Sequence, residues 1–271
     1  MDENFAFING EFVPFQQSAL PLSDLIIQRG YGIFDFFLVR DRIPPFISFH
    51  LDRFIHSAAV LGLDLSYTKE ELSDLVQHLI EKNNIQHSSI KIMLSGGLSA
   101  DDFTLVPENS TLIIINKPFE IRLPEAWKDG AALLTCKYQR EMPEAKTINY
   151  LRSVSLSQKL AESNAAELLY LDRNWVRECS RSNVYMVKGN CIITPKSKIL
   201  QGVTRRRILN TNGFEVVEAD FKFKDLLAAD EVFITSTTKG VLPIVSIDSH
   251  IISNGQIGAV TKAIKKSIMA E

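Results

Sequence analysis

The spacing of hydrophobic residues changes along the first third of the chain from that of strands to that of a helix. Residues 5–15, FAFINGEFVPF, hold two apolar-rich runs around Asn9-Gly10, a pair typical of a two-residue hairpin turn. The strand pattern continues in residues 32–47, GIFDFFLVRDRIPPFI. In FHLDRFIHSAAVLGL, residues 49–63, the apolar residues take helical spacing, and Gly62 is a typical helix end.

A second helix is predicted after Thr68, which forms a capping-box pair with Glu71 ahead of apolar residues at helical spacing. Residues 89–97, SIKIMLSGG, and 111–119, TLIIINKPF, have strand patterns and flank the loop LSADDFTLVPENS. We therefore expect an N-terminal α+β domain over residues 1–119, followed by a connector, EIRLPEAWKDG, at 120–130.

The rest of the chain alternates differently and predicts an α/β domain over residues 131–271. One helix is expected from about Tyr150 to Glu162 and a second from about Val203. A third is expected in the acidic segment between FEVVEADF and EVFITSTT, and a fourth at the C-terminus. A hairpin is expected to turn at Gly189-Asn190. The strand-like runs are AALLTCKYQ, AELLYLD, NVYMVKGNCIITP, FEVVEADF and EVFITSTT.

Composition narrows the class of protein. The 271 residues are 45% hydrophobic with a net charge of -2, which is typical of an ordinary globular protein. The N-terminus has no basic region or long apolar run, so we expect no membrane partner and a cytoplasmic location. Three scattered cysteines without a CxxC pair indicate neither a disulfide framework nor a metal site. The run Arg205–Arg207 is typical of a solvated helix face, so no nucleic-acid partner is expected.

The candidate chemistry lies in five short segments, because no P-loop, GxGxxG, HExxH or GxSxG motif occurs. In chain order the segments are HLDRF, AKTINYL, VRECSRSN, LQGVTRRRIL and ITSTTKG. Their order and separation resemble the class IV aminotransferases, the family of branched-chain aminotransferases, D-amino-acid aminotransferases and aminodeoxychorismate lyases. The resemblance implies the two-domain fold type IV, pyridoxal 5'-phosphate (PLP) as cofactor and a role in amino acid metabolism.

The resemblance also implies which residues hold the cofactor. PLP chemistry needs a primary amine to attack the cofactor aldehyde, and Lys146 in AKTINYL matches the family lysine. Glu178 in VRECSRSN matches the carboxylate that keeps the pyridine nitrogen protonated. The other implied contacts are Arg53, Val203, Thr204, Ser236 and Thr237 at the phosphate, Tyr150 at the phenolic oxygen, and Leu200 under the ring. Without the resemblance, Lys146 reads as one more surface lysine.

The substrate pocket is implied to include Phe34, Phe36, Lys91, Arg181 and Thr238, although a surface salt bridge is an alternative role for Arg181. The D-amino-acid enzymes carry an Arg-x-His pair on the loop that here reads GGLSADDF, and its two aspartates would repel a carboxylate. D-amino-acid specificity is therefore not expected. The two phenylalanines favour an apolar substrate group.

We therefore expect a homodimeric enzyme that moves an amino group between an apolar L-amino acid and a 2-oxo acid. Two alternatives stay open. The first is an aminodeoxychorismate lyase that releases pyruvate and p-aminobenzoate. The second is a non-catalytic binding or assembly module on the same fold, against which Lys146 and Glu178 argue because both chemical groups are present.

Overall fold

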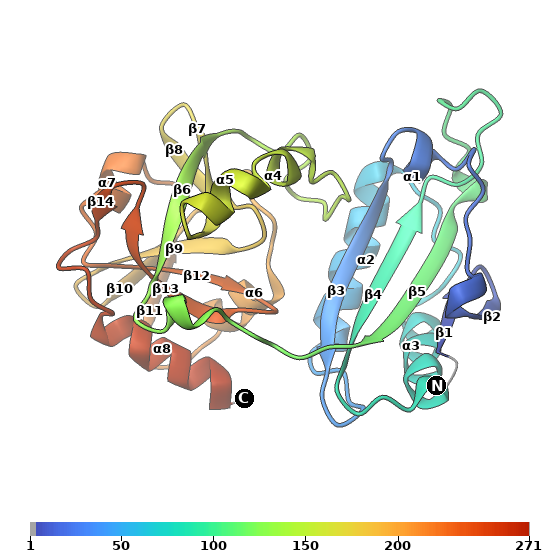
Figure 1. Ribbon diagram of the computed structural model, residues 1–271, viewed down its shortest axis with the longest axis horizontal. Helices are drawn as coiled ribbons and strands as arrows, with labels where there is room; N and C mark the ends of the chain where they lie inside the picture. The colour runs from blue at the N-terminus through green and yellow to red at the C-terminus, as the bar shows by residue number, and fades with distance from the viewer. Residues whose placement is uncertain (1–3, 271) are drawn as a thin grey trace. The chain divides into compact units, whose positions relative to one another are not determined.

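The computed structural model describes residues 4–270, which form two compact units (Figure 1). The N-terminal unit runs to Glu120 and also contains the hexapeptide Glu144–Asn149. The C-terminal unit comprises Ile121–Pro143 and the chain from Tyr150 onward. The division into domains at 1–119, 120–130 and 131–271 stays a prediction.

The N-terminal unit is an antiparallel five-stranded sheet, in the order β2-β1-β5-β4-β3, with α2 and α3 packed on one face (Figure 1). Side chains alternate along each strand, so that Ile33 and Phe37 point into the core with α2 and α3. The elements are β1 (Phe5–Ile8), β2 (Glu11–Pro14), η1 (Phe15–Gln17), α1 (Leu25–Gln28), β3 (Gly32–Val39), α2 (Ile47–Leu61), α3 (Lys69–Asn83), β4 (Ser88–Ser95), η2 (Pro107–Asn109) and β5 (Thr111–Pro118).

Three local predictions for this unit are confirmed. Asn9 and Gly10 both have positive φ, 41° and 98°, as the predicted two-residue turn requires. Helix α2 ends at Gly62, whose φ of 64° suits a glycine C-cap. Helix α3 begins with the predicted capping box, in which Thr68 and Glu71 bond to each other's backbone amides.

The C-terminal unit is built on a mixed sheet in the order β11-β10-β9-β12-β13-β6-β7-β8, with β14 paired to β13. One core contains the inward residues of β6, β7 and β12, and a second packs α8 and α6 against β9, β12 and β13. The elements are η3 (Glu125–Trp127), β6 (Ala131–Lys137), α4 (Leu151–Ser155), α5 (Ser157–Glu162), β7 (Ala165–Asp172), β8 (Trp175–Cys179), β9 (Asn183–Lys188), β10 (Cys191–Thr194), α6 (Val203–Leu209), β11 (Glu215–Glu218), α7 (Phe223–Leu227), β12 (Glu231–Ser236), β13 (Gly240–Ile247), β14 (His250–Ile251) and α8 (Ala259–Ala270).

Two expectations for this unit are wrong. The helix expected from Tyr150 to Glu162 is two short helices, α4 and α5, that meet at Leu156. Near that point the Ser155 hydroxyl donates to the carbonyl of Arg152, a local bond that competes with regular helix. Arg205 is not solvated: it is 1% exposed and its guanidinium lies 2.6 Å from Glu218 Oε1.

Candidate active site

The candidate residues fall into two groups, one in each unit. The N-terminal group comprises Phe34, Phe36, Arg53, Lys91 and Lys146. The C-terminal group comprises Tyr150, Glu178, Arg181, Leu200, Val203, Thr204, Ser236, Thr237 and Thr238.

Lys146 is held on the outer edge of β3. Its carbonyl accepts from Phe34 N at 2.9 Å, and Ile148 N donates to Gly32 O at 3.1 Å, so the segment pairs with β3 like a short strand. Ala145 beside it is buried in the core of the unit. The Lys146 ammonium then lies 4.6 Å from the centroid of the Phe34 ring. This backbone pairing fixes the position of the Lys146 Cα, and therefore the point from which its side chain extends.

Arg53 is oriented by a carboxylate that the sequence did not single out. Asp35, buried on β3, accepts from Arg53 Nε and Nη2, each at 2.8 Å, and lies 2.7 Å from His50 Nδ1. Burial would raise the pKa of Asp35, but the charge of Arg53 and the bond to His50 hold it well below its usual value. Burial lowers the pKa of His50, so this ring is neutral near pH 7. The guanidinium therefore has one fixed plane.

One face of α2 connects the Asp35–Arg53 pair with Lys146 through hydrogen bonds. His50, Arg53 and Ser57 are spaced three and four residues apart, so they lie along one side of the helix. The Ser57 hydroxyl donates to Arg53 O at 2.8 Å and accepts from Lys146 N at 3.0 Å. The candidate nucleophile and the candidate phosphate-binding arginine are thus joined through one serine.

Lys91 and Phe36 lie opposite each other on β4 and β3, and Lys91 Nζ is 5.3 Å from the Phe34 ring centroid. Partial burial, with a smaller effect of the Lys117 charge, lowers the pKa of Lys91. Phe34 therefore has two ammonium groups close to its ring, those of Lys91 and Lys146. The arrangement combines apolar walls with positive charge.

In the C-terminal unit, Glu178 is a buried carboxylate at the end of β8. Its Oε1 accepts from Arg140 Nε at 2.7 Å, and its Oε2 accepts from Leu200 N at 3.0 Å. The carbonyl of Leu200 accepts from Asn183 Nδ2 at 2.8 Å. Gly202 follows, and a Cβ there would lie 2.1 Å from Asn183 Oδ1, so any larger residue would displace the Asn183 side chain. These contacts fix the segment that leads into α6.

The hydroxyl-bearing candidates occupy the start of α6 and the turn between β12 and β13. Val203 and Thr204 are buried in the first turn of α6, after Gly202 as N-cap. Ser236 ends β12 and pairs with Gly240 across the turn that holds Thr237 and Thr238. The Arg181 side chain is exposed, on the turn between β8 and β9.

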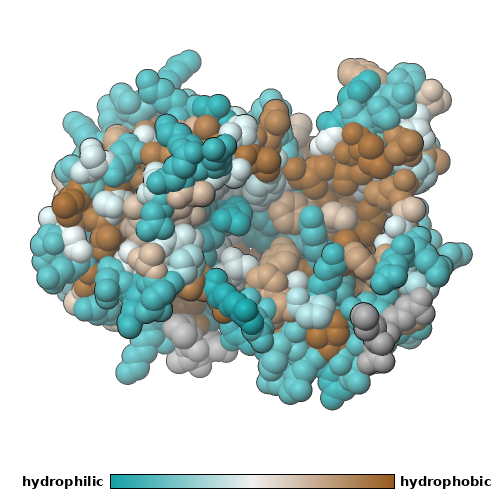
Figure 2. Space-filling model, in the orientation of Figure 1, coloured by the Kyte–Doolittle hydropathy of each residue, from teal (hydrophilic) through white to brown (hydrophobic). Residues whose placement is uncertain are grey.

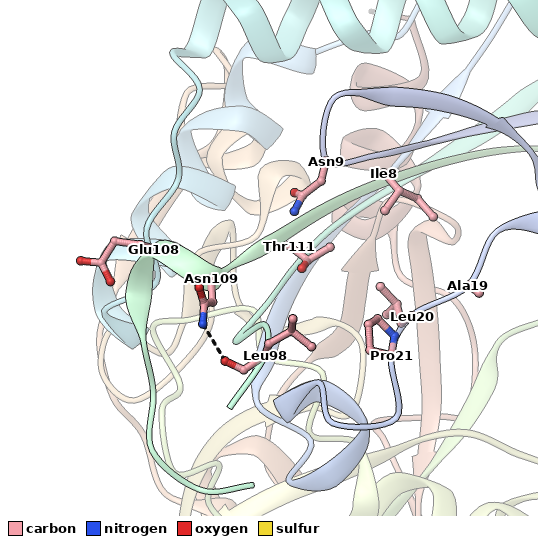
Figure 3. Close-up of a pocket in the computed structure, with 9 residues that line it drawn as sticks. All are labelled: Ile8, Asn9, Ala19, Leu20, Pro21, Leu98, Glu108, Asn109 and Thr111. Atoms are coloured by element: carbon pink, nitrogen blue, oxygen red, sulfur yellow. Dashed lines mark hydrogen bonds between the residues drawn. The ribbon is translucent and has the colours of Figure 1, made fainter. Parts of the chain in front are cut away.

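A surface pocket lies elsewhere in the N-terminal unit (Figure 3). It has a volume of about 380 Å³ and is lined by Ile8, Asn9, Ala19, Leu20, Pro21, Leu98, Glu108, Asn109 and Thr111, none of which is a candidate residue. Within residues 4–270, no group of three or more His, Cys, Asp and Glu side chains could hold a metal ion.

The loop next to this pocket is ordered by one of its aspartates. Asp101 accepts from Ser99 Oγ, from the backbone amides of Phe103 and Thr104, and from the Thr104 hydroxyl. These hydrogen bonds lower the pKa of Asp101 well below its usual value. Asp101 therefore fixes the conformation of the loop and also gives it a negative charge.

Sequence reasoning missed the polar partners of the site, which are buried except for the partly buried Arg140: Asp35, His50, Arg140, Glu167, Asn183 and Lys239. A signal existed for Asp35 and Glu167, because each is one acid inside an apolar strand run, where an ionised side chain requires a partner. No such signal exists for Arg140 or Lys239, which lie in polar loops.

Comparison with known proteins identifies the family. The family model described as amino-transferase class IV matches residues 32–247. A D-alanine aminotransferase of Staphylococcus epidermidis is 32% identical over 96% of this chain and 95% of its own. A proposed branched-chain-amino-acid aminotransferase of Methanocaldococcus jannaschii is 31% identical over 96% of this chain and 93% of its own. The chain belongs to the class IV aminotransferase family.

Solved structures agree on the fold. The branched-chain amino acid aminotransferase of Escherichia coli has a TM-score of 0.88, with 23% identity over 99% of this chain and 94% of its own. Another branched-chain amino acid aminotransferase, solved with pyridoxamine 5'-phosphate, has a TM-score of 0.89 and 24% identity over the same shares of the two chains. The predicted mixed fold of class IV aminotransferases is confirmed. The protein is a transferase of that family, whose cofactor is PLP.

A structure from the lyase branch is similar as well. A 4-amino-4-deoxychorismate lyase candidate of Legionella pneumophila has a TM-score of 0.83, with 23% identity over 92% of this chain and 94% of its own. The fold is therefore shared by both branches, and it does not by itself choose between transfer of an amino group and elimination of pyruvate.

The residues present fit this cofactor. A protonated ring nitrogen needs a buried carboxylate, and Glu178 is one, 5% exposed. A phosphate suits a guanidinium held in one plane, which Asp35 provides for Arg53. An aldehyde needs a primary amine at a fixed position, which the pairing of Lys146 with β3 provides.

Proposed function

We propose that this aminotransferase transfers an amino group from a small, mainly apolar L-amino acid to a 2-oxo acid, with Lys146 as its catalytic residue. The observation that carries the proposal is the pairing of Lys146 with the edge of β3, which holds its amine over the Phe34 ring on the unit that also fixes Arg53. PLP, when bound, supplies an electrophilic aldehyde and a ring that withdraws electrons from the substrate Cα.

The chain's own residues have separate tasks in this proposal. Lys146 would hold the cofactor through its primary amine and would serve as the base that moves the proton at the substrate Cα. Glu178, held by Arg140 and the Leu200 amide, keeps the ring nitrogen protonated. Arg53, Val203, Thr204, Ser236 and Thr237 bind the phosphate, while Tyr150 and Leu200 contact the ring.

The substrate preference rests on the faces of β3 and β4. Phe34 and Phe36 are apolar walls, and Lys91 beside them offers a cation for the substrate carboxylate. Arg181 and Thr238 are the further residues that we propose to contact the substrate. D-alanine aminotransferases are among the relatives, but the loop with Asp101 carries no Arg-x-His pair of the kind that the family resemblance associates with D-amino-acid enzymes. This absence supports an L-amino acid.

Labelling tests the role of Lys146. Purified protein incubated with PLP is reduced with borohydride and digested, and the pyridoxyl group is located by peptide mass mapping. We expect the label on Lys146 and none in a Lys146→Ala variant. A label on Lys137 or Lys159 in the wild-type protein would contradict the assignment.

A single-turnover screen tests the substrate. The PLP-loaded enzyme is mixed with one amino acid without acceptor, in matched L and D series, and the 2-oxo acid is quantified. At least one apolar L-amino acid should yield about one 2-oxo acid per site, and its D enantiomer far less. If no amino acid reacts while aminodeoxychorismate yields pyruvate and p-aminobenzoate catalytically, the lyase alternative replaces this proposal.

We also propose a cytoplasmic homodimer. Figure 2 shows hydrophobic surface gathered on the N-terminal unit, whose exposed apolar side chains include Leu22 and Phe103, 77% and 76% exposed. Such an exposed apolar surface supports an interface with a second copy of the chain. Among residues 4–270, no helix has both the length and the apolar character needed to cross a bilayer. Light scattering after size exclusion measures the mass, and a monomer at micromolar concentration would contradict the dimer.

A further inference from the structure

A buried ion pair lies in the C-terminal unit beside residues proposed to hold the cofactor. Glu167 on β7 and Lys239 in the turn before β13 approach to 2.7 Å between Oε1 and Nζ. Their side chains are 0% and 5% exposed. Two buried charges carry a desolvation cost that their attraction offsets only when further hydrogen bonds complete the arrangement. The other partners of Glu167 therefore matter.

Those partners come from one turn, residues 180–182 between β8 and β9. Ser180 Oγ donates to Oε2 at 3.1 Å, Arg181 N to Oε2 at 2.6 Å, and Ser182 Oγ to Oε1 at 2.5 Å. Burial would raise the pKa of Glu167, but the charge and hydrogen bond of Lys239, with smaller effects of the Ser182 hydroxyl and the Arg181 charge, lower it, so the carboxylate is ionised near pH 7. One carboxylate thus fixes the whole turn.

Lys239 extends this network to a second turn. It donates to Glu167 from the turn between β12 and β13, where it directly follows Ser236, Thr237 and Thr238. Its own backbone amide donates to Ser236 Oγ at 3.3 Å. The ion pair therefore connects the turn at 180–182 with the turn whose hydroxyls are proposed to bind the phosphate.

We infer that Lys239 is a positioning residue that, through Glu167, holds the turn at Ser236–Thr238 in place for the cofactor phosphate. This inference rests on the proposed function, in which Ser236 and Thr237 contact that phosphate. The Lys239 side chain is buried and its Nζ is paired with Glu167. Its influence reaches the phosphate only through the turn.

The test compares two ligands that differ by the phosphate. Apoprotein is titrated with PLP and with pyridoxal, and dissociation constants are measured for the wild type, Lys239→Met and the matched surface control Lys196→Met. Lys239→Met should weaken PLP binding by about tenfold or more, because the phosphate contacts are misplaced, and change pyridoxal binding by less than about threefold. The control should match the wild type for both ligands.

A double variant separates positioning from folding. Glu167→Gln/Lys239→Met removes both buried charges, so its thermal unfolding midpoint should return towards the wild-type value, while PLP binding stays weakened relative to pyridoxal. If Lys239→Met does not fold, the double variant gives the same comparison. Equal weakening of both ligands, or unchanged PLP binding in both variants, would overturn the positioning role. Wild-type protein that binds no PLP would instead contradict the proposed function.

Discussion

Replacing Asp35 with asparagine should destabilise the N-terminal unit strongly while keeping the side chain's shape. Asp35 is 0% exposed, and the change removes the charge that pairs with Arg53, which is itself nearly buried. Removing one partner of a buried ion pair costs about 3–5 kcal/mol of unfolding free energy, because the other charge stays buried without compensation. A surface pair contributes only about 0–1 kcal/mol. For Asp35→Asn we expect the loss of a buried pair, about 3–5 kcal/mol of unfolding free energy.

Urea unfolding followed by far-ultraviolet circular dichroism measures this loss, and hydrogen exchange of α2 amides locates it. The matched control is Asp52→Asn on α2, the helix that carries Arg53. Asp52 pairs with Lys69 at the surface, so its loss should cost less than about 1 kcal/mol. Both tryptophans, Trp127 and Trp175, lie in the C-terminal unit, so their fluorescence reports the other unit separately.

The pH dependence gives an independent reading. The pKa of Asp35 is lowered in the folded protein, whereas an unfolded aspartate titrates at about 3.9. Its stabilising contribution is therefore complete above about pH 5. The contribution is lost as the pH falls from the pKa of the unfolded aspartate towards the lower pKa of the folded one. The difference between wild type and Asp35→Asn should narrow in acid. A loss under about 1 kcal/mol at pH 7, or one that does not narrow, would refute the reasoning.

Three further predictions concern single residues. Glu178→Gln should retain PLP but lower kcat by about 10²-fold, and full activity would reduce Glu178 to a structural role. Gly202→Ala should lower stability by roughly 1–3 kcal/mol in thermal unfolding, because the new methyl meets Asn183 Oδ1, and adding Asn183→Ala should recover part of that loss. Lys91→Met should raise KM for the 2-oxo acid by about tenfold with kcat little changed, and an unchanged KM would remove Lys91 from the pocket.

The features that the sequence predicts well depend on neighbours in the chain. The turn at Asn9-Gly10 and the capping box of Thr68 each follow from the backbone needs of a few adjacent residues, so no distant contact can change them much. The position of Lys146 in the chain came from a family resemblance, but its pairing with β3 depends on residues far away in the sequence.

The features that it does not predict depend on burial of charge. Arg205 looks like its exposed neighbour Arg206, but its guanidinium is buried because Gln201 Oε1, Glu218 and the Pro195 carbonyl accept hydrogen bonds from it. Strand β8 was missed for a related reason. Arg177 interrupts its apolar pattern, yet this side chain is buried because Asp172 pairs with it at 2.9 Å. Partners that lie outside the helix or strand of each arginine decide these cases.

The pairing of residues 146–148 with β3 has a consequence for biosynthesis. A ribosome makes the chain from its N-terminus, and the first 120 residues contain all five strands of the N-terminal sheet. Until the hexapeptide Glu144–Asn149 emerges from the exit tunnel, one edge of β3 lacks its partner, and exposed edges favour association with other chains. Nascent N-terminal units should therefore be most vulnerable to aggregation, and most in need of chaperones, during the interval in which the ribosome translates the start of the second unit.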